Sequence, residues 1–178
     1  MKATVLGIGN VLLRDEGVGV HVVERLQQRF ALPAEVEVVD GGTTGMELTE
    51  CLSRRDLVVI VDAVRTGRPA GTPVRLSHEE LPAFFRTRIS PHQLGLSEVL
   101  ATLRLLNEAP RNSVLIGIEP VCMDTGLEMT PEVAAKVDEL VDMVVAELKA
   151  AGFAVTAKAP AEVPCDAGQP SPWTQVSA

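Results

Sequence analysis

Three short segments of this chain each supply a side chain that can bind a metal ion. Glu16 follows the first apolar run of the sequence, Asp62 ends another apolar run, and His92 lies where a helix should begin. In an open α/β sheet, the carboxyl ends of the strands meet at one edge, where ligands bind. Two carboxylates and one imidazole at that edge would suit a divalent transition metal.

The surroundings of His92 indicate the first turn of a helix. Ser90 can act as the N-cap, Pro91 suits the first helical position, and Gln93 completes a capping box. The positive end of the helix dipole disfavours the imidazolium form of His92, and neutral imidazole is the form that binds metals. Taken alone, a structural or solvated histidine is the commoner explanation.

Each carboxylate also has an ordinary structural interpretation. Asp62 can serve as an N-cap or turn residue, and Glu16 as an acidic residue favoured near a helix N-terminus. His21 and His78 have no comparable setting, and we interpret both as structural. The occurrence of Glu16, Asp62 and His92 together on one predicted edge favours a functional site.

A glycine-rich segment, Asp40-Gly41-Gly42-Thr43, closes a second strand at the same edge. Its two glycines allow a close approach of another chain, so a loop that contacts substrate and a plain turn are equally good interpretations.

Two other motifs of functional sites are incomplete or absent in this sequence. The Gly7-Ile8-Gly9 start of a dinucleotide fingerprint lacks its third glycine, and no G-x-S-x-G nucleophile motif occurs.

Strand-like and helix-like patterns alternate along the chain, which predicts a three-layer α/β/α sandwich with a mostly parallel, twisted sheet. We expect about five strands, one of them an antiparallel edge strand. Residues 1–157 should form a single α/β domain, and the Pro- and Ala-rich residues 158–178 a disordered tail. The expected strands are 3–8, 36–39, 57–61, 74–76 and 114–118, and the expected helices are 18–30, 46–52, 96–106 and 133–148, the last capped by Gly152.

The net charge, the spacing of the cysteines and the length of the apolar segments exclude several classes of protein. The 178 residues carry a net charge of −8, which argues against a binder of nucleic acid. Three widely spaced cysteines form no disulfide framework or CxxC pair. No segment has the length of a signal sequence or a membrane span, so we expect a cytoplasmic protein without membrane contact.

With these motifs in order, the chain resembles the hydrogenase maturation proteases, from about Lys2 to Gly152. The Ser90–Leu96 stretch resembles the branch that serves uptake-type hydrogenases. The motifs that carry the resemblance are Gly7-Ile8-Gly9-Asn10, Asp15-Glu16-Gly17-Val18-Gly19, Asp40-Gly41-Gly42-Thr43, Asp62-Ala63, Ser90-Pro91-His92-Gln93-Leu94-Gly95-Leu96, Ile116-Gly117-Ile118-Glu119-Pro120 and Leu127-Glu128-Met129-Thr130-Pro131.

The resemblance implies an endopeptidase that removes a short C-terminal extension from the nickel-loaded precursor of a nickel–iron hydrogenase large subunit. It implies that Glu16, Asp62 and His92 engage nickel, which arrives with the precursor. Three protein ligands leave positions open for substrate groups or water. Asp40, expected at the same edge, is our candidate for the general base, and Gly41, Gly42 and Thr43 are candidates for substrate contact.

Two other functions stay open at this point. A peptidyl-tRNA hydrolase-like enzyme would share the Gly-x-Gly-Asn start but should present a basic surface to RNA, which the net charge disfavours. A non-catalytic nickel-binding assembly factor would associate with a precursor and leave its mass unchanged.

Overall fold

A five-stranded sheet forms the middle layer of the protein. The computed structural model describes residues 1–87 and 91–159, with the side chains of residues 87, 91 and 92 excepted. The strand order is β3-β1-β4-β6-β5, in which β5 is the only antiparallel strand and lies at one edge. This confirms the predicted mostly parallel sheet. The strands are β1 (Ala3–Ile8), β3 (Val36–Gly42), β4 (Leu57–Ala63), β5 (Pro73–Leu76) and β6 (Ser113–Ile118).

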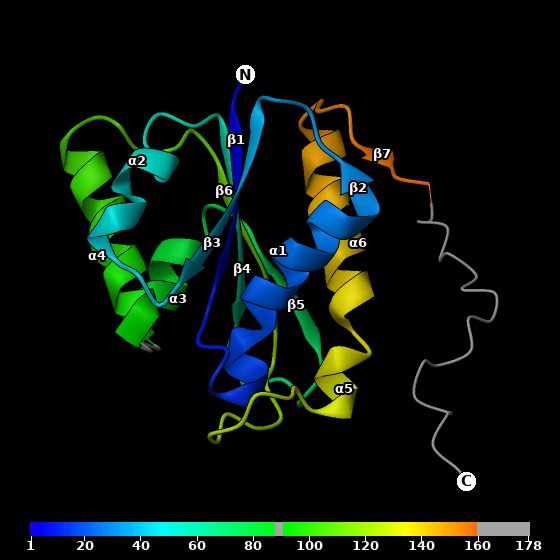
Figure 1. The fold of residues 1–178 in the computed structure, drawn as a ribbon. Coiled ribbons are helices and arrows are strands. Elements are labelled where there is room, and N and C mark those ends of the chain that lie inside the picture. The colour runs from blue at the N-terminus through cyan, green and yellow to red at the C-terminus, as the bar shows by residue number, and fades with distance from the viewer. Residues whose placement is uncertain (88–90, 160–178) are drawn as a thin grey trace, which may run out of the picture.

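Helices cover both faces of this sheet, so the predicted three-layer sandwich is also confirmed (Figure 1). Strands β1, β4 and β6 are buried along their whole length because each is apolar on both faces. One face carries α1 (Val18–Arg29), α5 (Pro131–Ala134) and α6 (Val137–Ala150), and the other η2 (Met46–Leu48), α2 (Thr49–Leu52), α3 (Leu81–Thr87) and α4 (Pro91–Leu105).

The C-terminal helical region differs from the prediction in one respect. The expected helix 133–148 is two helices, because the chain leaves the helical path between α5 and α6. The predicted cap at Gly152 is confirmed: this residue has φ of +92°, and its N–H donates to the carbonyl of Lys149. The N–H of Phe153 then reaches the carbonyl of Leu148, which completes a Schellman motif.

A small second sheet was not expected from the sequence. Helix α1 ends at Arg29, and Phe30, which the periodic pattern placed on the helix, begins β2 (Phe30–Ala31). Strand β2 pairs antiparallel with β7 (Thr156–Ala157), and the N–H of Lys158 donates to the carbonyl of Arg29. The segment predicted as a tail therefore begins in contact with the domain, and residues 160–178 lie outside the described part of the chain.

The start of α1 is pressed against the carboxyl ends of two central strands. A Cβ atom added to Gly19 would lie 2.3 Å from the carbonyl oxygens of both Ile8 in β1 and Val61 in β4. Only glycine fits there, so the loop before α1 is fixed over this end of the sheet. No helix in the described residues is both long and apolar enough to cross a membrane.

Candidate active site at the carboxyl end of the sheet

Glu16 and Asp62 lie at the same end of the sheet, as the sequence predicted. Glu16 belongs to a short 3₁₀ helix, η1 (Arg14–Gly17), between β1 and α1, and this helix contacts β4. Asp62 is the penultimate residue of β4 and is completely buried, while Glu16 is 6% exposed. Gly9 makes room for η1, because a Cβ atom there would lie 1.8 Å from the carbonyl oxygen of Glu16.

Gln93 connects Asp62 to the first turn of α4. Its Nε2 donates a hydrogen bond of 2.6 Å to Oδ2 of Asp62 and lies 3.4 Å from the carbonyl oxygen of Ala63. The backbone places His92 in this same turn, one residue before Gln93. The side chain of His92 lies outside the described part of the structure, as does Ser90, the partner in the predicted capping box.

The structure therefore describes the side chains of only two of the three predicted metal ligands, Glu16 and Asp62. Among the side chains that the structure describes, no three from His, Cys, Asp and Glu gather closely enough to hold a metal ion. Glu16 and Asp62 supply two buried carboxylates near the end of β4. The assignment of Glu16, Asp62 and His92 as metal ligands stays a prediction, and so does the binding of nickel.

Asp40 also lies at this end of the sheet, at the C-terminal part of β3 and beside Gly7 of β1. It is exposed, and its Oδ1 accepts the N–H of Gly42 at 2.9 Å. The strand runs to Gly42, so the predicted loop is shorter than expected. Gly41 is buried, Gly42 is partly buried with φ of +48°, and Thr43 is exposed. The role of Asp40 as general base and of residues 41–43 in substrate contact stays a prediction.

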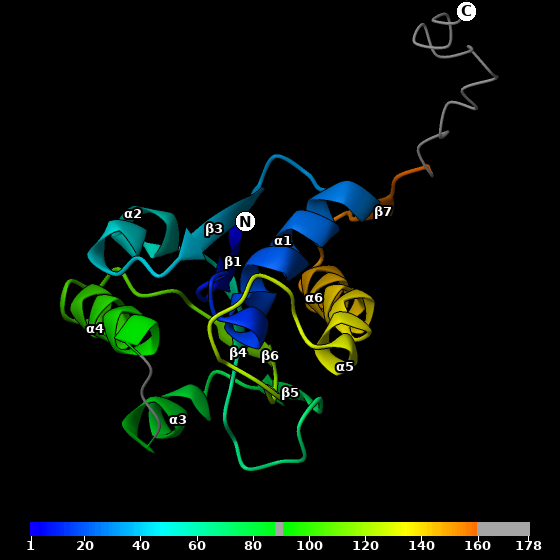
Figure 2. The same cartoon turned by 60° about the horizontal axis from the view of Figure 1, so that its bottom comes forward.

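Asp15 is a buried carboxylate whose structural role the sequence did not reveal. One oxygen accepts the N–H groups of Val121 and Cys122, both at 2.9 Å. The other accepts the N–H of Thr130 at 2.7 Å, and the hydroxyl of Thr130 lies 3.0 Å away. Asp15 thus fastens the connection between β6 and α5 to the segment that carries Glu16. Figure 2 shows this connection, in yellow-green, beside the start of α1. Its partners are too far along the chain for any local pattern to indicate them.

Glu119, the residue after β6, fixes a second loop at this end of the sheet. Its carboxylate accepts the N–H and hydroxyl of Thr66 and the N–H of Gly67. Burial by itself would raise the pKa of Glu119, but these hydrogen bonds and one from the Arg68 backbone lower it below its ordinary value. The anchored loop follows Asp62 and Ala63 in the chain, so Glu119 holds the segment that leaves the end of β4 in place.

The other two histidines each lie beside another polar group, and our interpretation of both as structural stays a prediction. His78 accepts the backbone N–H of Ser113 at 3.1 Å, at the amino end of β6. His21, on α1, lies 3.7 Å from Glu24.

A family model for hydrogenase maturation proteases matches residues 20–147. The chain is 44% identical over 153 residues to the hydrogenase 2 maturation protease of Escherichia coli K12, covering 85% of this chain and 93% of that protein. It is 41% identical over 157 residues to the hydrogenase expression/formation protein HupD of Rhodobacter capsulatus, covering 87% and 75%.

Solved structures give the same result. The hydrogenase maturating endopeptidase HybD from Escherichia coli has a TM-score of 0.86 and 43% identity, covering 89% of this chain and 98% of that one. The [NiFe] hydrogenase maturation protease HybD from Thermococcus kodakarensis has a TM-score of 0.69 and 27% identity, covering 83% and 99%. The fold is therefore that of an α/β peptidase.

The chain belongs to the hydrogenase maturation protease family, as its sequence motifs indicated. This assignment decides against the peptidyl-tRNA hydrolase interpretation.

Proposed function

We propose that this chain is the endopeptidase that removes the C-terminal extension from the precursor of a nickel–iron hydrogenase large subunit, of the uptake type. The observation that carries this proposal is the match of this chain to the hydrogenase maturation proteases, which covers residues 20–147 in the family model and 153 residues in the relative from Escherichia coli K12. The reaction belongs to the cytoplasm, where we expect the precursor to be assembled before it joins its partner subunit.

Glu16, Asp62 and His92 are the proposed ligands of nickel, which arrives as part of the precursor. Two features support this donor set: both carboxylates are buried beside the end of β4, and His92 lies in the α4 turn that Gln93 connects to Asp62. Carboxylate and imidazole together suit nickel and other divalent metals. Bound nickel would polarise the scissile carbonyl and increase the acidity of a coordinated water.

The protein's own groups have two further proposed tasks. Asp40 is the candidate general base, supported by its exposure and by its position at the same end of the sheet. Among the candidates for substrate contact, Gly42 and Thr43 fit better than Gly41. The latter is packed against β1, since a Cβ atom added to it would lie 2.7 Å from Leu6.

Intact-mass analysis of a cognate precursor, incubated with this protein with and without nickel loading, tests the proposed function. We expect loss of a C-terminal peptide only from the loaded precursor. If a demonstrably loaded cognate precursor binds but keeps its full mass, the protein is the non-catalytic assembly factor instead.

A further inference from the structure

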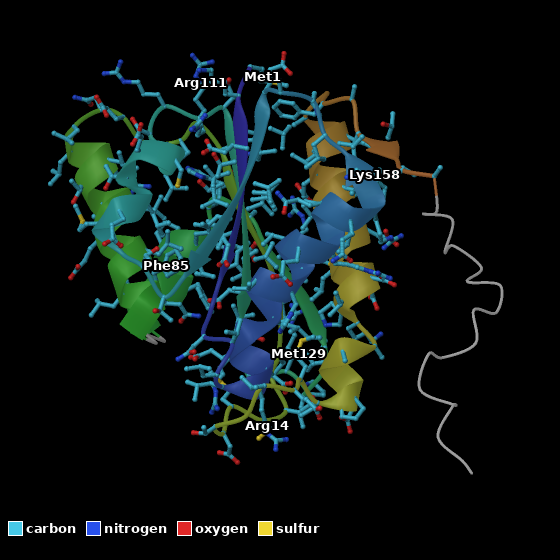
Figure 3. All side chains as sticks on the ribbon, viewed as in Figure 1. Met1, Arg14, Phe85, Arg111, Met129 and Lys158 are labelled. Carbon is cyan, nitrogen blue, oxygen red and sulfur yellow. The ribbon has the colours of Figure 1, made fainter. Side chains whose placement is uncertain are left out.

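Exposed apolar side chains gather at the end of the sheet that carries Glu16 and Asp62. The described part of the chain has nine large hydrophobic residues with high exposure. Five of them follow the carboxyl ends of β1, β3 and β6, and Leu94 lies in the first turn of α4, which Gln93 joins to the end of β4. The other three, Met1, Leu105 and Leu106, lie at the opposite end, and Figure 3 shows Met1 at the far end of the molecule from Arg14 of η1. Single exposed apolar residues are ordinary, but a concentration at one site marks an interaction surface. The six residues are Val11, Leu12, Met46, Leu94, Val121 and Leu127.

Four of these residues form what we call the loop surface: Val11, Leu12, Val121 and Leu127. Their two loops are fixed to each other, because the N–H of Gly126 donates to the carbonyl of Leu12 at 2.9 Å. The N–H of Val121 is in addition bound to Asp15, which precedes Glu16. The loop surface is therefore held in place by the backbone that positions Glu16.

Met46 and Leu94 form what we call the helix surface, on the other face of the sheet. Their elements touch through the backbone, since a Cβ atom added to Gly95 would lie 3.2 Å from the Cα atom of Gly45. Leu94 directly follows Gln93, whose side chain is bonded to Asp62. The helix surface thus adjoins the second proposed nickel ligand, as the loop surface adjoins the first.

We propose that the loop surface and the helix surface together dock an extended, apolar segment of the hydrogenase precursor next to its scissile bond. This inference rests on the proposed function. A polypeptide that touches both surfaces crosses the carboxyl edge of the sheet, where η1 and the end of β4 carry the buried Glu16 and Asp62, so docking brings the polypeptide to the candidate site. Burial of leucine, valine and methionine side chains favours an apolar partner, and the net charge of −8 gives no attraction for an acidic one.

Charge-introducing variants with a matched control test this inference. One double variant, Leu12→Glu with Leu127→Glu, disrupts the loop surface, and another, Met46→Glu with Leu94→Glu, disrupts the helix surface. The control, Leu105→Glu with Leu106→Glu, adds the same charge at the opposite end of the sheet. Leu12 and Leu127 are 56% and 71% exposed, Met46 and Leu94 are 55% and 44% exposed, and Leu105 and Leu106 are 84% and 59% exposed. None of these variants should therefore impair folding. Thermal unfolding of each variant checks this point.

The measurements are binding of the nickel-loaded precursor by biolayer interferometry, and KM and kcat of cleavage by intact mass. We expect each surface variant to weaken binding and raise KM by about tenfold or more with little change in kcat, and the control to match wild type. Binding by the surface variants equal to that of the control overturns the inference, as does a wild-type protein that does not bind. A wild-type protein that binds without cleaving refutes the proposed function alone, and the binding comparison still decides the docking surface.

Discussion

The amide of Gln93 is bonded to the buried carboxylate of Asp62 at 2.6 Å, and this contact joins α4 to the end of β4. Both side chains are buried, so the hydrogen bond lies in surroundings where an unsatisfied polar group is costly. The contact fixes the orientation of Asp62 and the position of the turn that carries His92. Gln93 is therefore a positioning residue of the candidate site.

Replacing Gln93 with Glu should destabilise the protein. The variant has nearly the same shape, but it places a second carboxylate against Oδ2 of Asp62 where an N–H donor stood. We expect the free energy of unfolding to fall by about 2 kcal/mol or more, because a buried hydrogen bond becomes a repulsion between like charges. Urea unfolding measures this change. Gln28→Glu, on the exposed side of α1, is the control, and equal stability of the two variants would contradict the prediction.

His92→Ala should abolish cleavage of the loaded precursor and leave the fold intact. His92 lies in the first turn of α4 at the end of the sheet, so we expect the free energy of unfolding to change by no more than about 0.5 kcal/mol. Intact-mass analysis and urea unfolding give the two readouts. His21→Ala, on α1, should cleave normally. Full activity of His92→Ala would refute its assignment as a ligand.

Asp15→Asn should loosen the connection between β6 and α5. The amide has one acceptor oxygen where the carboxylate has two, and its NH₂ group would face backbone N–H donors of residues 121, 122 or 130. We expect a loss of about 1–3 kcal/mol in the free energy of unfolding. Hydrogen exchange of residues 119–130 should also increase. Asp124→Asn, an exposed aspartate in the same connection, should show neither effect, and identical behaviour of the two variants would show that Asp15 is not a fastening residue.

The lowered pKa of Glu119 predicts a specific loss of stability in acid. A carboxylate whose pKa is lower in the folded than in the unfolded protein stabilises the fold above the unfolded pKa, about 4.3 for Glu. This contribution is lost as the pH falls through the folded pKa. The free energy of unfolding of wild type should thus exceed that of Glu119→Gln by a constant amount from roughly pH 5 to pH 7. This difference should shrink at lower pH, where Glu119 becomes protonated. Urea unfolding across this range measures it, and a difference that grows in acid would contradict the assignment.

Two truncations should distinguish the contribution of residues 155–159 to stability from that of residues 160–178. Deleting residues 160–178 should leave cleavage largely unchanged, because their composition is poor in core-forming residues. Deleting residues 155–178 also removes the buried Val155 and strand β7, which pairs with β2, so thermal stability should fall. Cleavage assays and thermal unfolding compare the two. Loss of activity in the shorter deletion would show that residues 160–178 take part in function.

Much of the fold was predictable because it depends on local periodicity. Runs such as Val58–Val61 are apolar on both faces, which is typical of buried parallel strands, and the helical spacing of Val18, Val22 and Leu26 indicated α1. The topology of α/β sheets then placed Glu16 and Asp62 at a shared edge. The sequence by itself thus determined the architecture, the family and the region of the site.

Only the tertiary structure decided which polar groups meet there. Gln93 was expected to act locally in a capping box, yet its amide reaches Asp62, and Asp15 finds its partners more than 100 residues away. The pairing of β2 with β7 likewise joins two segments that lie far apart in the sequence. Periodicity reports which face of an element is buried, but hydrogen bonds between distant segments depend on how the elements pack. The amino-acid pattern therefore located the candidate site, and packing selected the contacts that hold its residues in place.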